Sequence, residues 1–344
     1  FPGTAVQVTG TQCEYAQVQL DGGQTIWISK SDMDLPSAAS TSAPLRIELP
    51  RIVPAAEWVD IVVPTSARPT YIVEESARSV SLTFYGVSAG SSGTASGSYA
   101  ARVGSTDPFV TLLEQSRSGE RATLTIDLAS APFGYLALYE NGNFILRLRR
   151  PPTVDPVSPL KGLTIAVDPG HPPVGATGPT GLWEPQATLP VGFKLRDMLL
   201  EKGANVVLTR SAHEDVDLAV RPTVSRRNNA HAFVSIHYNA LPDGVNPFTN
   251  HGTNTYYFYQ HSQALAGQVQ RNLTREMGLR DKGVHFGNFA VIRGTWMPSV
   301  LAEGAFIMIP DQEAAMRTSQ YQEQYARGIV QGLEDYFRTF TPQK

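Results

Sequence analysis

Two histidines and a glutamate in this chain have the residue types and the placement of a hydrolytic site. His171 follows an apolar run and an Asp-Pro-Gly turn, His237 ends a second short apolar run, and Glu303 closes a third. Each run is typical of a buried β-strand. Because ligands bind beyond the carboxyl ends of the strands in an open α/β sheet, we expect the three side chains to meet at one edge.

A second glutamate completes a set of zinc ligands. His171, Glu184 and His237 supply two neutral imidazoles and one carboxylate, which leave a bound ion positively charged and open to water. A glycine-rich loop joins His171 to Glu184, and such a loop can fold back until both side chains meet one ion. Glu303 would then remain unligated and move a proton from the water to the leaving nitrogen.

Each of these residues also has a purely structural explanation. A histidine at a strand end is often only hydrogen-bonded, and Glu184 could be an acid at a helix N-terminus, where the dipole favours it. Glu303 is the hardest to explain in this way, because a carboxylate that closes an apolar run is costly to bury without a partner. Four such residues, each at a strand end or in an adjoining loop, favour a functional site.

The bulk composition is that of a globular protein with more than one domain. The chain has 344 residues, of which 42% are hydrophobic and 17% charged, and its formal net charge is -3. This balance, with no long basic run, argues against a dedicated nucleic-acid binder. Cys13 is the single cysteine, which excludes an intrachain disulfide and a thiolate metal cluster. No apolar stretch reaches the roughly 20 residues of a membrane span.

The sequence predicts a multidomain protein in which all-β modules precede an α/β domain. Turn-rich and Pro-rich stretches divide the chain into a small β module, a linker, an all-β domain, a second linker and the α/β domain, at 1–35, 36–45, 46–149, 150–161 and 162–344. The first module weakly resembles a small Src-homology-like barrel truncated at its start. A β hairpin packed on the next domain fits its pattern equally well.

The domains differ in their periodicity. Residues 46–149 read as strands throughout, with a two-residue hairpin turn at Asn141-Gly142, which predicts a sandwich or barrel. The last segment alternates strands with helical stripes that begin at Val191, Ala264 and Tyr321, which predicts a mostly parallel sheet flanked by helices. Its strands are expected at 163–167, 205–209, 232–236, 253–259, 289–292 and 299–303.

Two weaker signals do not change this interpretation. Gly86-Val-Ser88-Ala-Gly90 matches the nucleophile-elbow pattern, but Ser- and Gly-rich chain follows it where that motif needs a helix. His251 and His285 fall in predicted loops that border the cleft, where either could bind substrate or simply lie on the surface.

At these residues the chain resembles a known family, the zinc-dependent N-acetylmuramoyl-L-alanine amidases that hydrolyse bacterial cell-wall peptidoglycan. The resemblance covers about 162–340. It is carried by a series of motifs in family order: Val167-Asp-Pro-Gly-His171, Gly181-Leu-Trp-Glu184, Leu218-x-x-Arg221, Ser235-Ile-His237-Tyr-Asn239-Ala240, Asp281-Lys-Gly-Val284, Phe289-Ala-Val-Ile-Arg293 and Pro298-Ser-Val-Leu-Ala-Glu303-Gly-Ala-Phe306.

The resemblance implies a role for each motif residue. It makes His171, Glu184 and His237 the ligands of one Zn²⁺ and Glu303 the catalytic carboxylate. The substrate-binding residues expected beside them are Asn239, His285 and Arg293.

The resemblance also implies a substrate and a compartment. The reaction would be hydrolysis of the lactyl–L-alanine amide of peptidoglycan, by a secreted autolysin of the cell envelope, periplasmic or extracellular, that takes part in cell division. Because the chain begins at Phe1, we expect a signal peptide to have been removed. The middle domain weakly resembles the β modules that hold such amidases to the wall. A protein activator is a further expected partner, and the sequence does not define the oligomeric state.

The chain departs from the family pattern at three places. Pro172-Pro173 replaces Gly-Gly, Pro185 replaces a basic residue, and Asn254 stands where glutamate is common. These changes affect substrate contacts near the metal more than the metal site itself. They keep two alternatives open: an inactive wall-binding or regulatory protein, and a zinc peptidase that cuts within the stem peptide.

Overall fold

The computed structural model describes residues 2–21, 23–34, 45–88, 99–104, 107–242 and 244–341, with 99–103 as backbone alone. The chain forms two compact units, 1–150 and 151–344. The first linker, predicted at 36–45, lies outside the described residues apart from Leu45. The second, predicted at 150–161, buries Val154 and Leu160 and contains a turn around Asp155. The finer division into modules stays a prediction.

The N-terminal residues form a three-stranded antiparallel sheet in the order β1-β2-β3, with bounds Gln7–Gln12, Tyr15–Asp21 and Gln24–Ser29. Val18 and Leu20 on the inner face pack with Tyr85 of the following domain. Asp21 forms an ion pair with Arg121 of that domain. These contacts favour a small sheet packed on the next domain, and its kinship to a Src-homology-like barrel stays a prediction.

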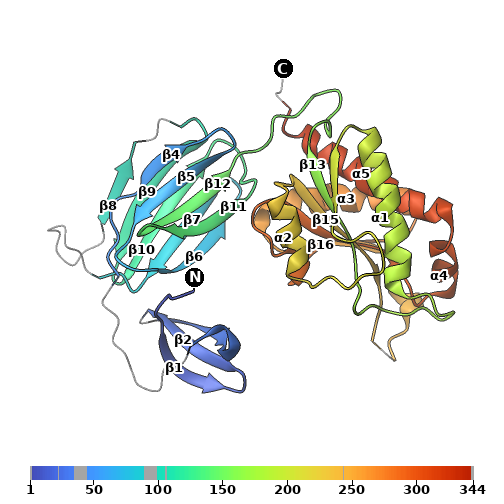
Figure 1. Ribbon diagram of the computed structural model, residues 1–344, viewed down its shortest axis with the longest axis horizontal. Helices are drawn as coiled ribbons and strands as arrows, with labels where there is room; N and C mark the ends of the chain where they lie inside the picture. Colours follow the sequence, from blue (N-terminus) through green and yellow to red (C-terminus); the bar gives the residue numbers. More distant parts are fainter. Residues whose placement is uncertain are drawn as a thin grey trace. The chain divides into compact units, whose positions relative to one another are not determined.

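The middle of the chain is all-β, as predicted, and it forms a sandwich, one of the two architectures expected from the sequence. One sheet has the order β6-β7-β10-β9-β8 and the other β11-β12-β5-β4 (Figure 1). The strands are β4 (Arg51–Pro54), β5 (Trp58–Pro64), β6 (Thr70–Glu75), β7 (Ser79–Tyr85), β8 (Tyr99–Val103), β9 (Val110–Ser118), β10 (Arg121–Leu128), β11 (Tyr135–Glu140) and β12 (Asn143–Arg149). The predicted hairpin joins β11 to β12, and Asn141 and Gly142 both have positive φ, 50° and 74°, as a type I′ turn requires.

The C-terminal unit contains a six-stranded sheet in the order β14-β13-β15-β18-β16-β17. The first four strands are parallel, whereas β16 runs antiparallel to β18, and β17 runs parallel to β16. This confirms the mostly parallel sheet. The bounds are β13 (Thr164–Pro169), β14 (Asn205–Leu208), β15 (Ala232–Asn239), β16 (Thr253–Tyr257), β17 (Asp281–Phe286) and β18 (Ser299–Phe306).

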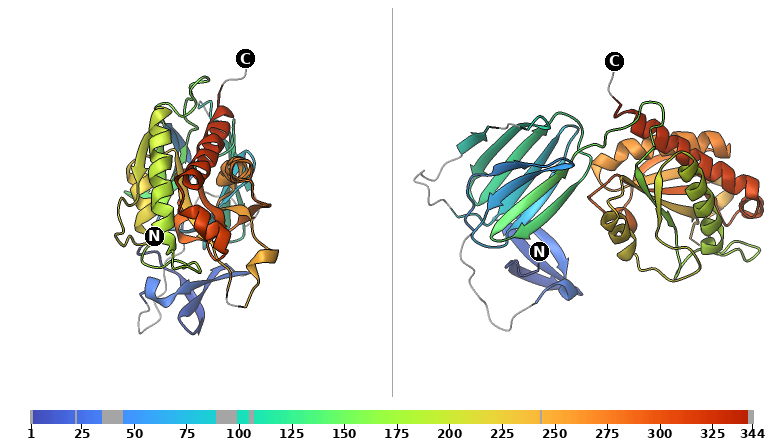
Figure 2. Two further views of the ribbon diagram at one scale, coloured as in Figure 1. Left: turned by 90° about the vertical axis from the view of Figure 1, so that its right-hand side faces the viewer. Right: turned by 45° about the horizontal axis from the view of Figure 1, so that its top comes forward.

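Helices cover this sheet, as Figures 1 and 2 show. They are α1 (Glu184–Glu201), α2 (Val220–Arg227), α3 (Gln263–Met277), α4 (Pro310–Met316) and α5 (Ser319–Arg338). Helix α5 packs between α1 and α3, and all three stripes predicted from the sequence lie in these helices. On α5, Tyr325, Ile329 and Leu333 are fully buried, because their four-residue spacing keeps them on one face of the helix.

One predicted strand is wrong. Residues 289–292 contain the 3₁₀-helix η4 (Ala290–Ile292), and the edge of the sheet is formed instead by β17. A short apolar run does not distinguish a strand from another buried segment, and here Val291 and Ile292 are buried outside the sheet. The polar sequence of β17 suits an exposed edge strand and gave no apolar signal.

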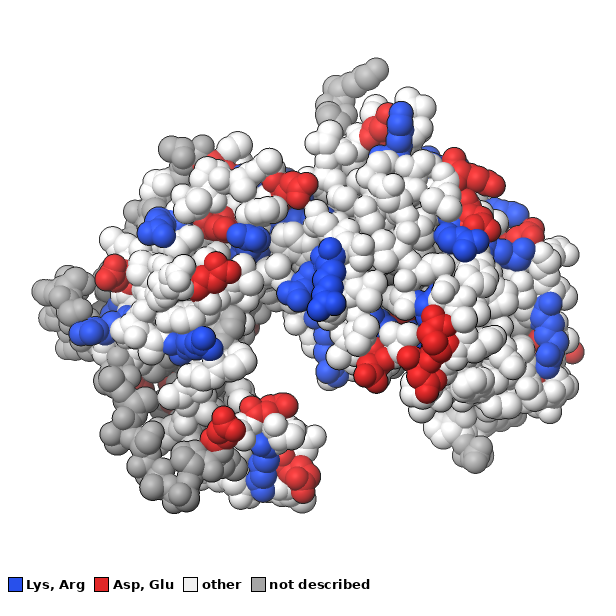
Figure 3. All heavy atoms as spheres, in the orientation of Figure 1, with Lys and Arg blue, Asp and Glu red and all other residues white. Residues whose placement is uncertain are grey.

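The surface carries charges of both signs. On the face shown in Figure 3, basic and acidic side chains are interspersed with wide uncharged areas. This agrees with the small formal net charge of -3. Within the described ranges, no helix combines the length and the apolar composition that crossing a membrane requires.

Candidate active site

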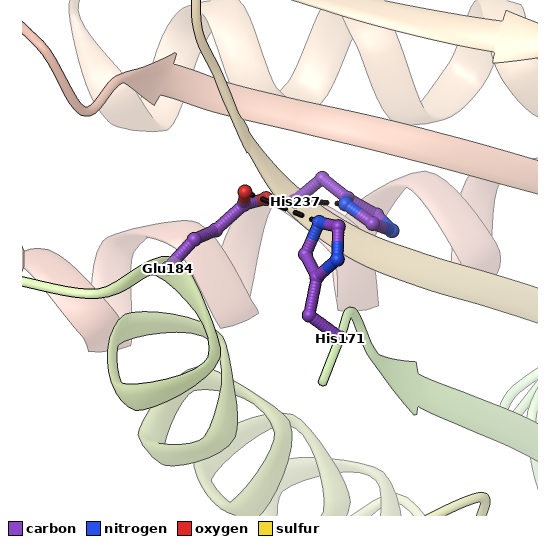
Figure 4. Close-up of side chains that lie close together, drawn as sticks. All are labelled: His171, Glu184 and His237. Carbon is purple, nitrogen blue, oxygen red and sulfur yellow. Dashed lines mark hydrogen bonds and ion pairs between the residues drawn. The ribbon is translucent and has the colours of Figure 1, made fainter. Parts of the chain in front are cut away.

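The two histidines and Glu184 come together at the carboxyl edge of the sheet (Figure 4). His171 follows β13 with a left-handed φ of 61°, and His237 lies on β15. His171 Nε2 lies 3.1 Å from Glu184 Oε2, and His237 Nδ1 lies 3.1 Å from Glu184 Oε1. The sequence prediction that these side chains converge agrees with this geometry.

The geometry of these donors suits a zinc ion. Two ligand atoms at about 2.0–2.1 Å from one tetrahedral ion lie roughly 3.3 Å apart. One donor atom from each of the three residues falls within 4.8 Å of the others. Two imidazoles and one carboxylate are also the ligand types of catalytic zinc sites. The residues present therefore fit the ion that the sequence predicts.

Glu184 is held in place by the protein as well as by the histidines. It is the first residue of α1 and only 3% exposed, and its carboxylate accepts backbone N–H bonds from Tyr238 (3.0 Å) and Ala176 (3.1 Å). Burial acts to raise the pKa of Glu184, but the hydrogen bonds to His171 and His237 hold it well below its usual range. Glu184 is thus both a helix N-terminal acid and a candidate ligand, so the two explanations are compatible.

A buried polar chain fixes the orientation of His237. Ser235 Oγ lies 3.1 Å from His237 Nε2 and donates a hydrogen bond of 2.6 Å to Asp168. Because that hydroxyl proton is used, Ser235 can only accept from His237 Nε2, so Nδ1, which hydrogen-bonds Glu184 in the metal-free protein, is the nitrogen that would offer its lone pair to a bound ion. Asp168 in turn pairs with Arg221 at 2.7 Å, and both are fully buried. The sequence alone did not predict a role for this series of hydrogen-bonded side chains.

Close backbone packing explains two glycines of the motifs. A Cβ on Gly170 would lie 2.4 Å from the ring of His237, and one on Gly304 would lie 2.3 Å from the ring of Tyr325. Tyr325 on α5 directs its hydroxyl to the carbonyls of His237 (3.0 Å) and Ala302 (2.7 Å). One side chain therefore contacts both the strand of His237 and the strand of Glu303.

Glu303 lies beside the three donors without binding them. Strand β18 continues to Phe306, so Glu303 is inside the strand and not at its end as predicted. Its Oε2 is buried and has no hydrogen-bond partner among the described residues. Burial, and then repulsion by the Glu184 carboxylate, raise the pKa of Glu303 well above its usual value. A carboxylate whose pKa is raised binds a proton more strongly than an ordinary one, which suits a general base.

A pocket of about 450 Å³ contains the four residues and accounts for part of the predicted substrate set. Asn239 lines it, and its amide donates to Asn254 at 3.3 Å. His285 and Arg293 are exposed and are not among the residues that line it, so their role stays a prediction.

Sequence reasoning missed two aromatic residues of the pocket, Tyr256 and Phe289. Their rings pack edge to face with centroids 4.9 Å apart. Phe289 stays 40% exposed, and its place directly before η4 was hidden by the incorrect strand assignment. An aromatic residue in a short apolar run carries no sequence signal that separates pocket lining from core.

The departures from the family pattern lie around this pocket. The carbonyl of Pro172 accepts a hydrogen bond from Arg221 at 2.9 Å, so the Pro-Pro loop is tied to the buried ion pair. Asn254 on β16 is 1% exposed and stands opposite Glu303 of β18 in the backbone register of the two strands. Neither change removes one of the three candidate ligands.

Comparison with known proteins shows which family the C-terminal part of the chain resembles. Residues 165–335 match the family described as N-acetylmuramoyl-L-alanine amidase (Amidase_3). The chain is 36% identical to N-acetylmuramoyl-L-alanine amidase LytC of Bacillus subtilis over 187 residues, which are 53% of this chain and 37% of LytC. It is 32% identical to N-acetylmuramoyl-L-alanine amidase CwlM of Bacillus licheniformis over 182 residues, which are 50% of this chain and 68% of CwlM.

A solved structure is also similar to part of this chain. N-acetylmuramoyl-L-alanine amidase AmiC2 of Nostoc punctiforme is 33% identical, with a TM-score of 0.48, over 51% of this chain and 98% of that chain.

Proposed function

Because the chain belongs to the N-acetylmuramoyl-L-alanine amidase family through residues 165–335, we propose that it hydrolyses the lactyl–L-alanine amide of peptidoglycan with zinc and a glutamate base. The observation that carries this proposal is the placement of Glu303. Glu303 lines the same pocket as His171, Glu184 and His237, and its Oε2 has no hydrogen-bond partner in the described part of the chain. A ligand set and a separate proton acceptor are the two parts that such a hydrolysis needs.

The residues divide the chemistry between them. When bound, zinc polarises the carbonyl and lowers the pKa of water. His171, Glu184 and His237 would hold the ion, and the hydrogen bond from His237 to Ser235 keeps the correct ring nitrogen turned toward it. Glu303 accepts a proton from the attacking water and passes it to the amide nitrogen. The C–N bond breaks, which gives a lactyl carboxylate and a free L-alanine amine.

The substrate and compartment follow from the family. LytC and CwlM are N-acetylmuramoyl-L-alanine amidases by name, and we propose the bacterial cell wall, outside the cytoplasm, as the place of action. The aligned region is only 37% of LytC, so the activity of the whole protein is part of the proposal. We further propose that the β-rich unit 1–150 holds the enzyme to the wall.

Mass spectrometry of products released from purified peptidoglycan tests the reaction. We expect free peptides that begin at L-alanine, lost on chelation and restored by zinc. Release of peptides that are cut further along the stem would show that the protein is a zinc peptidase and not an amidase. Binding to the wall with no release, under any metal, would favour the inactive wall-binding protein.

The variant Glu303→Gln tests the assigned base. It should abolish release yet bind one zinc per chain, because Glu303 makes no hydrogen bond to His171, Glu184 or His237 among the described residues. Near-normal turnover by this variant would show that the mechanism is wrong. A loss of zinc would instead make Glu303 a ligand.

A further inference from the structure

A third buried carboxylate lies outside the pocket and contacts the loop that leads to Glu184. Glu313 on α4 is fully buried and does not line the pocket. It accepts backbone N–H bonds from Thr180 at 2.9 Å and from Leu182 at 2.9 Å, and a third bond from the Thr180 hydroxyl at 2.9 Å. Arg317, one turn further along, lies 3.4 Å from the same carboxylate.

The loop itself is shaped around this carboxylate. A Cβ on Gly178 would lie 2.5 Å from the carboxyl carbon of Glu313, so only glycine lets the backbone come this close. The N–H of Gly178 bonds the carbonyl of Leu182 at 2.9 Å, and the N–H of Gly181 bonds the carbonyl of Gly178 at 3.0 Å. Glu313 therefore fills the inside of a closed turn at 178–182.

That turn ends two residues before a candidate metal ligand. Leu182 bonds Glu313, Trp183 is the N-cap of α1, and Glu184 is its first residue. A loop that contains three glycines has many conformations when it is free, and ordering it costs conformational entropy. Bonds from Glu313 on α4 to two N–H groups of the turn, those of Thr180 and Leu182, remove that freedom before any ion arrives.

We propose that Glu313 is a positioning residue for the metal site. It locks the turn 178–182, and the turn sets the start of α1 and thereby the place of the Glu184 carboxylate between His171 and His237. The inference rests on the proposed function, in that His171, Glu184 and His237 bind zinc. It concerns the affinity and geometry of the site rather than the bond that is cut.

Zinc affinity of the full chain tests the proposal, measured by competition with a chromogenic chelator. Glu313→Ala and Glu313→Gln should weaken zinc binding by about tenfold or more, the lower range for residues that support metal ligands. The visible spectrum of the cobalt-loaded protein should change as well, because it reports ligand geometry. Asp311→Asn is the matched control: Asp311 is an exposed acid on the same helix and should leave both readouts unchanged.

A second variant approaches the same contact from the loop. Gly178→Ala places a methyl group against Glu313, at a residue whose φ is not in the left-handed region, and should also weaken zinc binding. Gly267→Ala is its control, because a Cβ there meets nothing within 4 Å. If the Glu313 variants fail to fold, the zinc affinity of Gly178→Ala decides whether the contact between Glu313 and the turn supports zinc binding.

The outcomes separate this inference from the proposed function. Folded Glu313 variants with wild-type zinc affinity and cobalt spectrum, and only a lower melting temperature, would make Glu313 merely structural and overturn the proposal. A wild-type chain that binds no zinc would refute the proposed metal chemistry itself. A wild-type chain that binds zinc tightly but releases no peptide would refute the amidase reaction and leave the role of Glu313 in zinc binding intact.

Discussion

His237 on β15 stands opposite Glu303 on β18 in the register of two adjacent parallel strands. The candidate ligand and the candidate base are thus separated by one strand spacing and belong to the same rigid sheet. Their relative position does not depend on a loop.

Glu303 should set the acidic limb of the pH–activity profile. Burial and the Glu184 carboxylate raise its pKa well above the ordinary 4.5. A general base works only as the carboxylate, so activity is present above the raised pKa and is lost as the pH falls through it. We expect kcat/KM for a soluble muropeptide to decline at a pH clearly above 4.5. A profile that stays flat down to that pH would exclude Glu303 as the base.

Glu303→Gln should stabilise the metal-free protein at neutral pH while it removes activity. Because the folded-state pKa is raised, the unfolded chain loses this proton at a lower pH, and stability falls as the pH rises from 4.5 toward the folded pKa. Glutamine does not titrate and avoids this loss. Urea unfolding in the presence of a chelator should give the variant the higher midpoint at neutral pH. The advantage should shrink below pH 4.5, and a lower midpoint at neutral pH would contradict it.

Asp168→Asn should destabilise the C-terminal unit. Asp168 and Arg221 are fully buried, and removal of one partner of a buried pair costs about 3–5 kcal/mol because it leaves the other charge uncompensated. Asp197→Asn is the control, since the exposed pair with Arg196 is worth about 0–1 kcal/mol. Denaturant unfolding checks both. If both variants lost the same free energy of unfolding, burial would not decide how much an ion pair contributes to stability.

Tyr325→Phe should lower turnover more than stability. Its hydroxyl bonds the carbonyls of His237 and Ala302, a contact worth about 0.5–1.5 kcal/mol in unfolding. A shift of these strands moves Glu303 relative to the ligands, and misplacement by 1 Å costs up to about 10²-fold in rate. We expect kcat to fall with little change in KM.

Tyr321→Phe is the matched control for that experiment. Tyr321 lies one turn earlier on α5, and its hydroxyl has no hydrogen-bond partner among the described residues. Removal of an unpaired buried hydroxyl should leave kcat unchanged and be neutral or stabilising. A wild-type kcat for Tyr325→Phe would show that its hydroxyl does not position the site.

Much of the candidate site could be predicted from the sequence, because His171, His237 and Glu303 lie within or directly after locally recognisable strands. The run before Asp168-Pro-Gly and the run before His237 each have the composition of a buried strand. Parallel strands bring their carboxyl ends to one edge, so a local pattern was enough to predict that His171 and His237 meet. The same reasoning located Glu303 on the correct strand, though not its extension to Phe306.

Other parts were decided only by the tertiary structure. Glu313 lies far along the chain from Thr180, and nothing in either local pattern shows that a carboxylate closes the turn before Glu184. The segment 289–292 was expected to be a strand and contains the helix η4, whereas the edge strand is β17, for which no strand was expected. Short segments take their conformation from what they pack against. Local periodicity thus determined which residues the sheet would bring to its edge. Packing between distant segments determined which side chains hold the site residues in place. Such contacts leave no regular spacing in the sequence, so the sequence alone did not predict them.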